Sequence, residues 1–290
     1  MMKWADWYHT ITMIWVSILI ATYNGADHIN ATINSCLAQT YTDFELLIID
    51  DQSSDDTRML IQTIFDSRIK LYRTEINQWP YKSLNILLDH AKGRYIAIQD
   101  HDDIRHCDKI KTQIDFLDTN SQYIWCGTQT LMYYESDSTW FEYSLSWHYT
   151  IHPSLVFRAW NYRYPDTVYM NDALFQKAIL CKWRKLISTI DQTLSLHRIK
   201  SWSTNYSYKR FMINKKNIHT IFQIHSLWYG CMVLVREIMR KIVYPVLIQI
   251  WCSRYIDRIE RIPFTIYGKT IQKYDNLKLT SMWFIIKISI

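Results

Sequence analysis

The chain has 290 residues, of which 49% are hydrophobic and 21% charged, proportions typical of a folded globular protein and unlike those of disordered or collagen-like chains. Its five glycines lie too far apart for the glycine-rich fingerprints of dinucleotide-binding and P-loop folds. The six cysteines form no C-x-x-C pair, so neither a zinc ribbon nor a disulfide framework is indicated, and a reducing compartment is favoured.

The net charge of +6 is unevenly distributed along the chain. Residues 201–290 hold 14 Lys and Arg against 4 Asp and Glu, whereas residues 1–200 hold 19 against 23. The basic segment is rich in Trp and Tyr, which suits an anionic membrane surface or an anionic glycan. An ordinary solvated helical face would have the same composition, so both interpretations stay open. We expect neither a signal peptide over the apolar stretch 11–20 nor a membrane span, because no apolar run reaches about 18 uncharged residues.

Patterns typical of strands and helices alternate over the first 120 residues. Apolar runs over 16–21 and 44–49 predict buried strands, and residues 27–39 between them have helical spacing. A helix over about 53–65, a strand over 69–72, a helix over 83–91 and a strand over 95–99 follow. This order predicts an open, mostly parallel α/β sheet. Further on, residues 125–157 are aromatic and β-branched, residues 172–190 predict a helix, and the pattern beyond about 205 is mainly helical.

Polar segments follow three of the predicted strands, at 22–24, 50–51 and 100–103. Ligands of such sheets bind beyond the carboxyl ends of the strands, so we expect the three segments to converge there. Carboxylates from two neighbouring strand ends repel one another, which favours a bound cation. Mg²⁺ or Mn²⁺ would take carboxylate oxygens and leave positions open for phosphate oxygens. Asp103 is interpreted instead as the N-cap of the helix that continues through residues 110–117.

Three segments in this order and spacing carry a family resemblance: VSILIATYNG at 16–25, LAQTYTDFELLIIDDQSSDDT at 37–57 and LDHAKGRYIAIQDHDDI at 88–104. Together they resemble the nucleotide-binding half of a glycosyltransferase family 2 enzyme with the GT-A fold. The resemblance implies a GT-A domain over residues 1–205, with a nucleotide-sugar half at 15–120 and an acceptor half at 121–205. A basic, aromatic-rich helical region would occupy residues 206–290.

The resemblance also implies roles for residues on the donor side. The loop after the first strand, with Thr22, Tyr23 and Asn24, would hold the base and ribose of the nucleotide. Asp51 would hydrogen-bond the uracil ring, Asp100 would lie beside the sugar nucleotide, and Asp102 would ligate the metal ion that bridges the diphosphate. Lys82 and Asn85 fall on a polar helix that approaches the donor in this family. The loop before that helix lacks the usual glycine, since Asn77 is followed by Gln78, Trp79 and Pro80.

Other residues match the acceptor side of the family. Asp172 fills the position of the catalytic base at the start of a helix, where Asn171 replaces the more usual second acid. An N-cap role would suit Asp172 as well. His152 lies in a segment that resembles the acceptor-side strand, and His197-Arg198 stands where related chains often have Tyr-Arg.

The resemblance implies an inverting, metal-dependent enzyme that moves a sugar from a UDP-sugar to a glycan or lipid-linked acceptor in surface polysaccharide or lipopolysaccharide synthesis. We expect a cytoplasmic location, with peripheral contact to the inner face of the membrane through the basic region. A non-catalytic relative that binds nucleotide or glycan is the alternative, which the departures at residues 78–80, 171 and 197 keep open. Nucleic-acid binding is not indicated, because the basic residues are diffuse and match no known motif.

Overall fold

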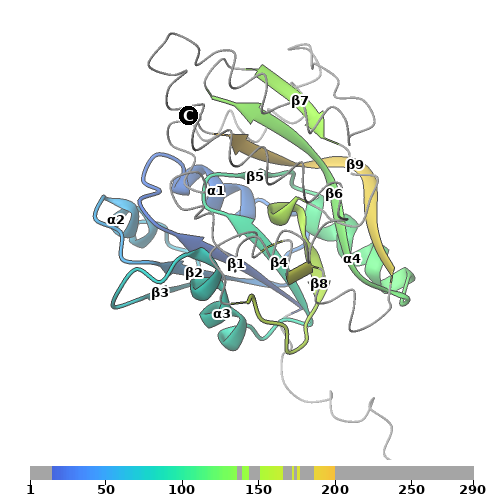
Figure 1. Cartoon of the computed structure of the whole chain (residues 1–290), viewed down its shortest axis with the longest axis horizontal. Coiled ribbons are helices and arrows are strands. Elements are labelled where there is room, and N and C mark those ends of the chain that lie inside the picture. The colour runs from blue at the N-terminus through green and yellow to red at the C-terminus, as the bar shows by residue number, and fades with distance from the viewer. Residues whose placement is uncertain are drawn as a thin grey trace, which may run out of the picture.

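The computed structural model describes residues 15–135, 139–143, 151–165, 172, 175–176 and 186–199. In this part of the chain a nine-stranded mixed sheet is flanked by helices (Figure 1). The elements are β1 (Val16–Thr22), α1 (Ile29–Leu37), β2 (Phe44–Asp50), α2 (Thr57–Gln62), β3 (Ile69–Arg73), α3 (Pro80–His90), β4 (Tyr95–Asp100), β5 (Ile104–Arg105), α4 (Lys109–Thr119), β6 (Tyr123–Tyr134), β7 (Thr139–Tyr143), the 3₁₀ turn η1 (His152–Ser154), β8 (Val156–Arg158) and β9 (Leu186–Ile199).

The sheet has a parallel half and a mixed half. Its strand order is β3-β2-β1-β4-β8-β6-β9-β5, with β7 paired to β6. The first four strands in this order run parallel to one another, which confirms the four predicted strands and the predicted βα alternation. Every residue of β1 and β2 is buried, as continuous apolar runs in a covered parallel sheet require.

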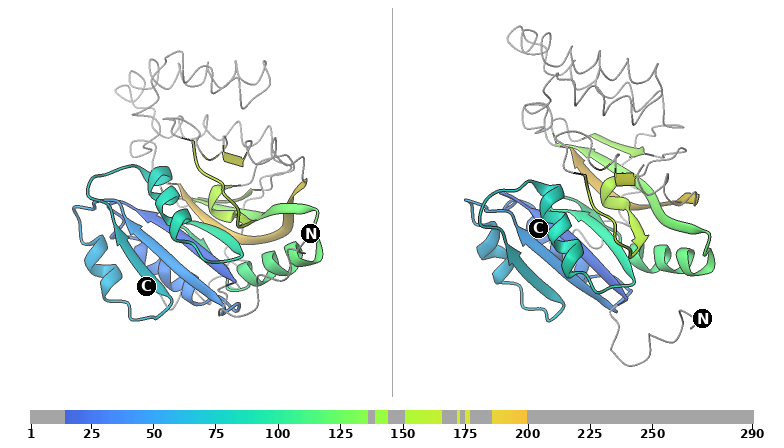
Figure 2. Two further views of the ribbon diagram at one scale, coloured as in Figure 1. Left: turned by 90° about the horizontal axis from the view of Figure 1, so that it is seen from below. Right: turned by 60° about the horizontal axis from the view of Figure 1, so that its bottom comes forward.

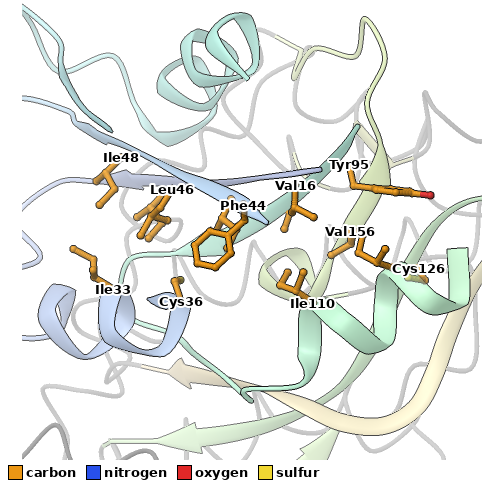
Figure 3. Packing of buried hydrophobic residues seen from close by; sticks show 14 of the residues in the cluster. Val16, Ile33, Cys36, Phe44, Leu46, Ile48, Tyr95, Ile110, Cys126 and Val156 are labelled. Atoms are coloured by element: carbon orange, nitrogen blue, oxygen red, sulfur yellow. The ribbon is translucent and has the colours of Figure 1, made fainter. Parts of the chain in front are cut away.

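Helices cover both faces of the parallel half (Figure 2). On one face α1, α2 and α4 pack against the sheet, and Ile33 and Cys36 of α1 lie opposite Leu46 and Ile48 of β2 (Figure 3). On the other face Leu84 and Leu87 of α3 pack with apolar residues of β1, β2 and β4. The buried residues of α1 recur at helical spacing, so they form one face of this short helix that packs against the sheet.

The mixed half corrects one prediction. Residues 186–190, the end of the helix expected over 172–190, belong to β9, which runs parallel to β6 and antiparallel to β5. The segment Leu186–Ile199 contains Ile and Thr residues that favour strands, but its polar centre at Asp191 and Gln192 hides the alternation. Pairing with the long strand β6 therefore decides its conformation.

The basic region predicted over 206–290 lies outside the described residues, as does Asn171. Among the helices that the structure does describe, none combines the length and the apolar character needed to cross a lipid bilayer.

Candidate active site

The three predicted polar segments meet at one edge of the sheet. Thr22 at the end of β1 lies in register with Asp50 of β2, and Ala21 lies in register with Asp100 of β4. The backbone N–H of Asp51 donates to the carbonyl of Thr22 at 2.8 Å. The expected convergence at the carboxyl ends of the parallel strands is thus confirmed.

The loop after β1 is tied to the loop after β2. The Asn24 N–H donates to Ser53 Oγ at 3.0 Å, and Asn24 Oδ1 accepts from the Ser54 N–H at 2.9 Å. Thr22 is buried and its hydroxyl has no hydrogen-bond partner among the described residues, whereas Tyr23 is 41% exposed. The two loops are therefore connected by hydrogen bonds. The contacts of residues 22–24 with base and ribose stay a prediction.

Asp50, the last residue of β2, and Asp51, which follows it, have different hydrogen-bond partners. Asp50 Oδ1 accepts from the Ser53 N–H at 3.0 Å, and its other oxygen lies 3.6 Å from Arg73 Nε, so Asp50 orients its own loop. Asp51, which is 2% exposed, accepts at Oδ1 from the Thr74 hydroxyl at 2.9 Å.

Asp51 also holds the loop that precedes α3. Its Oδ2 accepts from the Trp79 N–H at 2.7 Å, and both of its oxygens accept from the Gln78 N–H, at 2.9 and 3.1 Å. The carboxylate predicted to read the nucleobase therefore holds the backbone of residues 78 and 79 in this structure.

Asp100, about one third exposed, faces the acceptor-side segment. Its Oδ1 lies 3.3 Å from His152 Nδ1, and His152 Nε2 lies 2.8 Å from the Tyr164 hydroxyl. Burial alone would raise the pKa of Asp100, but the hydrogen bond and charge of His152 outweigh it and lower that pKa. Burial lowers the pKa of His152, and the bond to Asp100 together with neighbouring carboxylates raises it above the usual value. The two groups thus stabilise each other in the charged state.

Asp103 is not a helix cap, which corrects the sequence interpretation. Helix α4 begins at Lys109 with Asp108 in the N-cap position, because the two-residue strand β5 intervenes. Asp103 instead lies 2.7 Å from His197 Nδ1 and accepts from the Arg198 N–H at 2.9 Å. Residues 197 and 198, whose role the sequence leaves open, therefore connect β9 to the acidic turn.

Asp103 is buried, and the half-buried His197 contacts it. Burial and the charges of Asp102 and Asp100 raise the pKa of Asp103 to about 7, although His197 acts in the opposite direction. Burial lowers the pKa of His197, but the charge and hydrogen bond of Asp103 raise it to about 9. Burial is the main cause of the raised Asp103 pKa, whereas the raised His197 pKa reflects the neighbouring carboxylates.

The turn 100–103 fits the divalent cation that the sequence predicts. Ligand atoms of Asp100, Asp103 and His197 lie within 4.8 Å of one another, and Asp102 is half-buried beside them. Carboxylate oxygens and an imidazole suit Mn²⁺ or Mg²⁺, and a cation here would offset the repulsion that raises the Asp103 pKa. The role of Asp102 as metal ligand stays a prediction.

The predicted base, Asp172, acts electrostatically on residues of the same site. Asp172 is half-buried, and its negative charge acts together with burial to raise the pKa of both Tyr81 and Tyr164. Its charge also favours the protonated form of His152. Asp172 and Asp100 therefore act on the same three side chains, those of Tyr81, His152 and Tyr164.

Lys82 and Asn85, the two residues predicted to approach the donor, both lie on α3. The amide of Asn85 pairs with the backbone of Tyr164, donating at 3.0 Å and accepting at 2.8 Å, so it positions the acceptor-side segment. Lys82 is exposed on the same helix. Tyr81 and Tyr164, whose ring centroids lie 5.3 Å apart, were not predicted, since aromatic residues are common throughout this chain.

A protein-family model and several curated proteins match this chain. The family model described as Glycosyl transferase family 2 matches residues 17–182. Two Escherichia coli UDP-Glc:alpha-D-GlcNAc-diphosphoundecaprenol beta-1,3-glucosyltransferases match over shorter stretches: WfaP is 46% identical over 104 residues (36% of this chain, 41% of WfaP), and WfgD is 42% identical over 106 residues (37% and 42%). The chain thus spans about two fifths of the length of these curated relatives.

Solved structures show the same fold. The crystal structure of S. aureus TarS 1–349 in complex with UDP-GlcNAc matches with a TM-score of 0.60 and 18% identity, covering 78% of this chain and 72% of that one. Mannosyltransferase PcManGT from Pyrobaculum calidifontis, in complex with GDP-Man and Mn²⁺, matches with a TM-score of 0.54 and 16% identity, covering 71% and 61%. The mixed sheet, the acidic turn after β4 and the match over residues 17–182 agree, and this chain belongs to glycosyltransferase family 2, with the GT-A fold.

Proposed function

We propose that the chain is an inverting, metal-dependent glycosyltransferase that moves a sugar from a UDP-sugar to a hydroxyl of a glycan or lipid-linked acceptor in surface polysaccharide synthesis. The observation that carries this proposal is the meeting of Asp51, the acidic turn 100–103 and Asp172 around one edge of the sheet. The names of the relatives WfaP and WfgD, which specify UDP-glucose and a lipid-linked acceptor, support the choice of substrates. With a lipid-linked acceptor, the enzyme would act at the cytoplasmic face of the membrane.

Each acidic residue has a separate task in this reaction. Asp51 would read the nucleobase, and Asp102 with Asp100 would hold Mn²⁺ or Mg²⁺ on the donor side. The bound ion supplies charge neutralisation to the leaving diphosphate. His152, hydrogen-bonded to Asp100 at 3.3 Å, fixes that carboxylate between the donor and the acceptor side.

Asp172 acts as the general base. It takes the proton from the acceptor hydroxyl while that oxygen forms its bond to the anomeric carbon and the bond from this carbon to the diphosphate breaks. The displacement occurs in one step, so the configuration at the anomeric carbon inverts and UDP leaves.

The first test is UDP binding by calorimetry, with and without Mn²⁺, on the parent protein and on Asp102→Ala. We expect Mn²⁺ to strengthen UDP binding to the parent by at least tenfold, because a divalent ion offsets the charge of both the diphosphate and the acidic turn. Asp102→Ala should lose this metal effect but keep the binding seen without metal. UDP binding to the parent that is indifferent to Mn²⁺ would contradict the metal-dependent mechanism.

The second test separates an enzyme from a non-catalytic relative. After a screen of UDP-sugars, Asp172→Asn should lower kcat by about 10²–10⁴-fold, the usual contribution of a general base, and leave UDP affinity unchanged. Departures from the family pattern at residues 78–80, 171 and 197 favour the binding-only alternative. A parent protein that binds UDP but transfers no sugar from any UDP-sugar to lipid-linked or glycan acceptors would support that alternative.

A further inference from the structure

Three non-glycine residues of the described chain have positive φ angles: Asn24 at 49°, Gln52 at 68° and Trp79 at 77°. They lie in the loops that follow β1, β2 and β3, all at the edge where the nucleotide is proposed to bind. Residues held in such sparsely populated conformations cluster at ligand sites, where the surrounding structure maintains them.

Trp79 has a strained backbone conformation. Asn24 and Gln52 have φ angles close to the left-handed helical region, whereas Trp79 combines a φ of 77° with a ψ of 151°, a region that glycine alone adopts readily. Pro80 follows as the first residue of α3, and proline disfavours a helical ψ in the residue before it. Trp79 is thereby confined to an extended ψ, so a helical conformation offers no way to relieve the strain.

Asp51 maintains this conformation. Its carboxylate, 2% exposed, accepts from the Gln78 and Trp79 N–H groups at 2.7–3.1 Å and from the Thr74 hydroxyl at 2.9 Å. Three donors therefore surround the carboxylate, and the Gln78 N–H is shared between its two oxygens. A nucleobase N–H that bonds to Oδ2 competes with the Trp79 N–H, which is the shortest of these bonds at 2.7 Å.

The loop before α3 also contains a buried polar atom without a hydrogen-bond partner among the described residues. The side-chain oxygen of Asn77 is buried and has no hydrogen-bond partner in the described part of the chain. A buried polar atom without a partner costs free energy, so this loop conformation has an unpaired acceptor in addition to a strained backbone.

We propose that Trp79 is a positioning residue whose strained backbone promotes nucleotide binding: the base takes an Asp51 oxygen from the Trp79 N–H, and the loop 77–80 relaxes. This inference rests on the proposed function, in which Asp51 reads the base. The strain raises the free energy of the unliganded state. Because nucleotide binding releases part of this strain, it increases the affinity for the nucleotide by that amount of free energy.

Two substitutions at one position separate the backbone from the indole. Trp79→Gly removes the indole and the strain, while Trp79→Ala removes the indole but keeps a Cβ, and with it the strain. We expect Trp79→Gly to bind UDP about tenfold more weakly than the parent in calorimetry, and Trp79→Ala to stay within about threefold. Trp160→Gly, at a 54% exposed Trp near the opposite edge of the sheet, controls for the loss of an indole and the gain of a glycine and should leave UDP affinity unchanged.

Hydrogen exchange measured on peptides that cover residues 74–80 gives a readout independent of affinity. UDP should accelerate exchange of the Trp79 amide in the parent, because this N–H loses Asp51 as its acceptor, whereas the Gln78 N–H keeps its bond to Oδ1. Slower exchange on UDP binding would overturn the proposal, as would equal UDP affinity of Trp79→Gly and the parent, or an equal loss in Trp79→Ala and Trp79→Gly. A parent that binds no UDP would overturn the proposed donor together with this inference, whereas a parent that binds UDP with unchanged variants overturns this inference alone.

Discussion

Arg105 and Lys109 place two cations in the interior beneath the acceptor half of the sheet. Both side chains are fully buried. Arg105 Nε donates to Gln99 Oε1 at 2.8 Å, and Lys109 Nζ donates to the carbonyl of Pro153 at 3.3 Å. Burial first, and the neighbouring Arg105 charge next, hold the pKa of Lys109 well below its usual value. A lysine in this position lowers the stability of the fold at neutral pH, because the unfolded chain binds its proton more tightly.

Lys109→Met is therefore expected to raise the free energy of unfolding at pH 7 by about 1–2 kcal/mol, since an apolar chain of similar length suits the buried position. A depressed lysine pKa lowers stability most at low pH, and stability recovers as pH rises toward the unfolded value near 10.5. The gain from Lys109→Met should hence shrink between pH 7 and pH 10 in urea denaturation. Lys111→Met on the exposed side of the same helix is the control, and an equal gain in both variants would refute the argument.

Some residues of the site could be predicted from the sequence, but their contacts could not. The run LLIIDD and the resemblance were enough to single out Asp51, because a carboxylate after a buried strand is a local feature. Its partners at residues 74, 78 and 79 were not predictable, since a loop's backbone conformation depends on how α3 docks. The pair Asp103–His197 joins residues 94 positions apart, a contact that no local pattern contains.

At the scale of elements, Glu45 joins the first three strands at the edge opposite the site. It accepts from Ser17 Oγ at 2.6 Å on β1, from Lys70 Nζ at 2.7 Å on β3, and from the Lys92 N–H at 2.8 Å after α3. Burial alone would raise the Glu45 pKa, but these bonds outweigh it and lower that pKa. Glu45 thus stabilises the alignment of strands on which the loops at the other edge depend.

Glu45→Gln should lower the free energy of unfolding by about 2 kcal/mol at pH 7, the usual contribution of charge-assisted bonds to a buried group. A lowered carboxyl pKa gives stability that is present above the unfolded value of about 4.5 and is lost as pH falls through the folded value. The difference between parent and variant should therefore shrink below pH 4.5 in denaturation experiments. Glu75→Gln, at an exposed glutamate, provides the control, and a difference that is independent of pH would count against this role.

Elements differ in how far their sequence determines them. Strands β1, β2 and β4 were predicted because each has a continuous apolar run between turn signals, and β3 was predicted as a short strand over residues 69–72. Strand β9 was mistaken in part for a helix, since Asp191 and Gln192 interrupt its apolar pattern and its partner β6 lies more than 50 residues earlier. The two-residue strand β5 carries too little sequence for any pattern, yet it separates Asp103 from α4 and so frees that carboxylate to bind His197.

At the scale of the whole molecule, charge divides the chain into two parts. Residues 201–290 hold 14 Lys and Arg against 4 Asp and Glu, while the part before them is net negative. A lipid-linked acceptor would bring the enzyme to an anionic surface, which repels the acidic part and attracts the basic one. The proposed membrane contact therefore belongs to the basic region, and it is electrostatic in origin.

The full-length chain should bind vesicles that contain anionic phosphatidylglycerol and should bind neutral phosphatidylcholine vesicles at least tenfold more weakly. Raising salt from 0.05 to about 0.5 M should remove most of this difference, because the screening length falls several-fold. Each basic residue near an anionic surface contributes about 1 kcal/mol, so Lys215→Gln with Lys216→Gln should weaken binding about thirtyfold in a sedimentation assay. The pair Lys92→Gln with Lys111→Gln, at exposed positions of the GT-A domain, removes the same charge and should have little effect. Equal losses in the two double variants would show that net charge alone, and not the basic region, attracts the chain to the membrane.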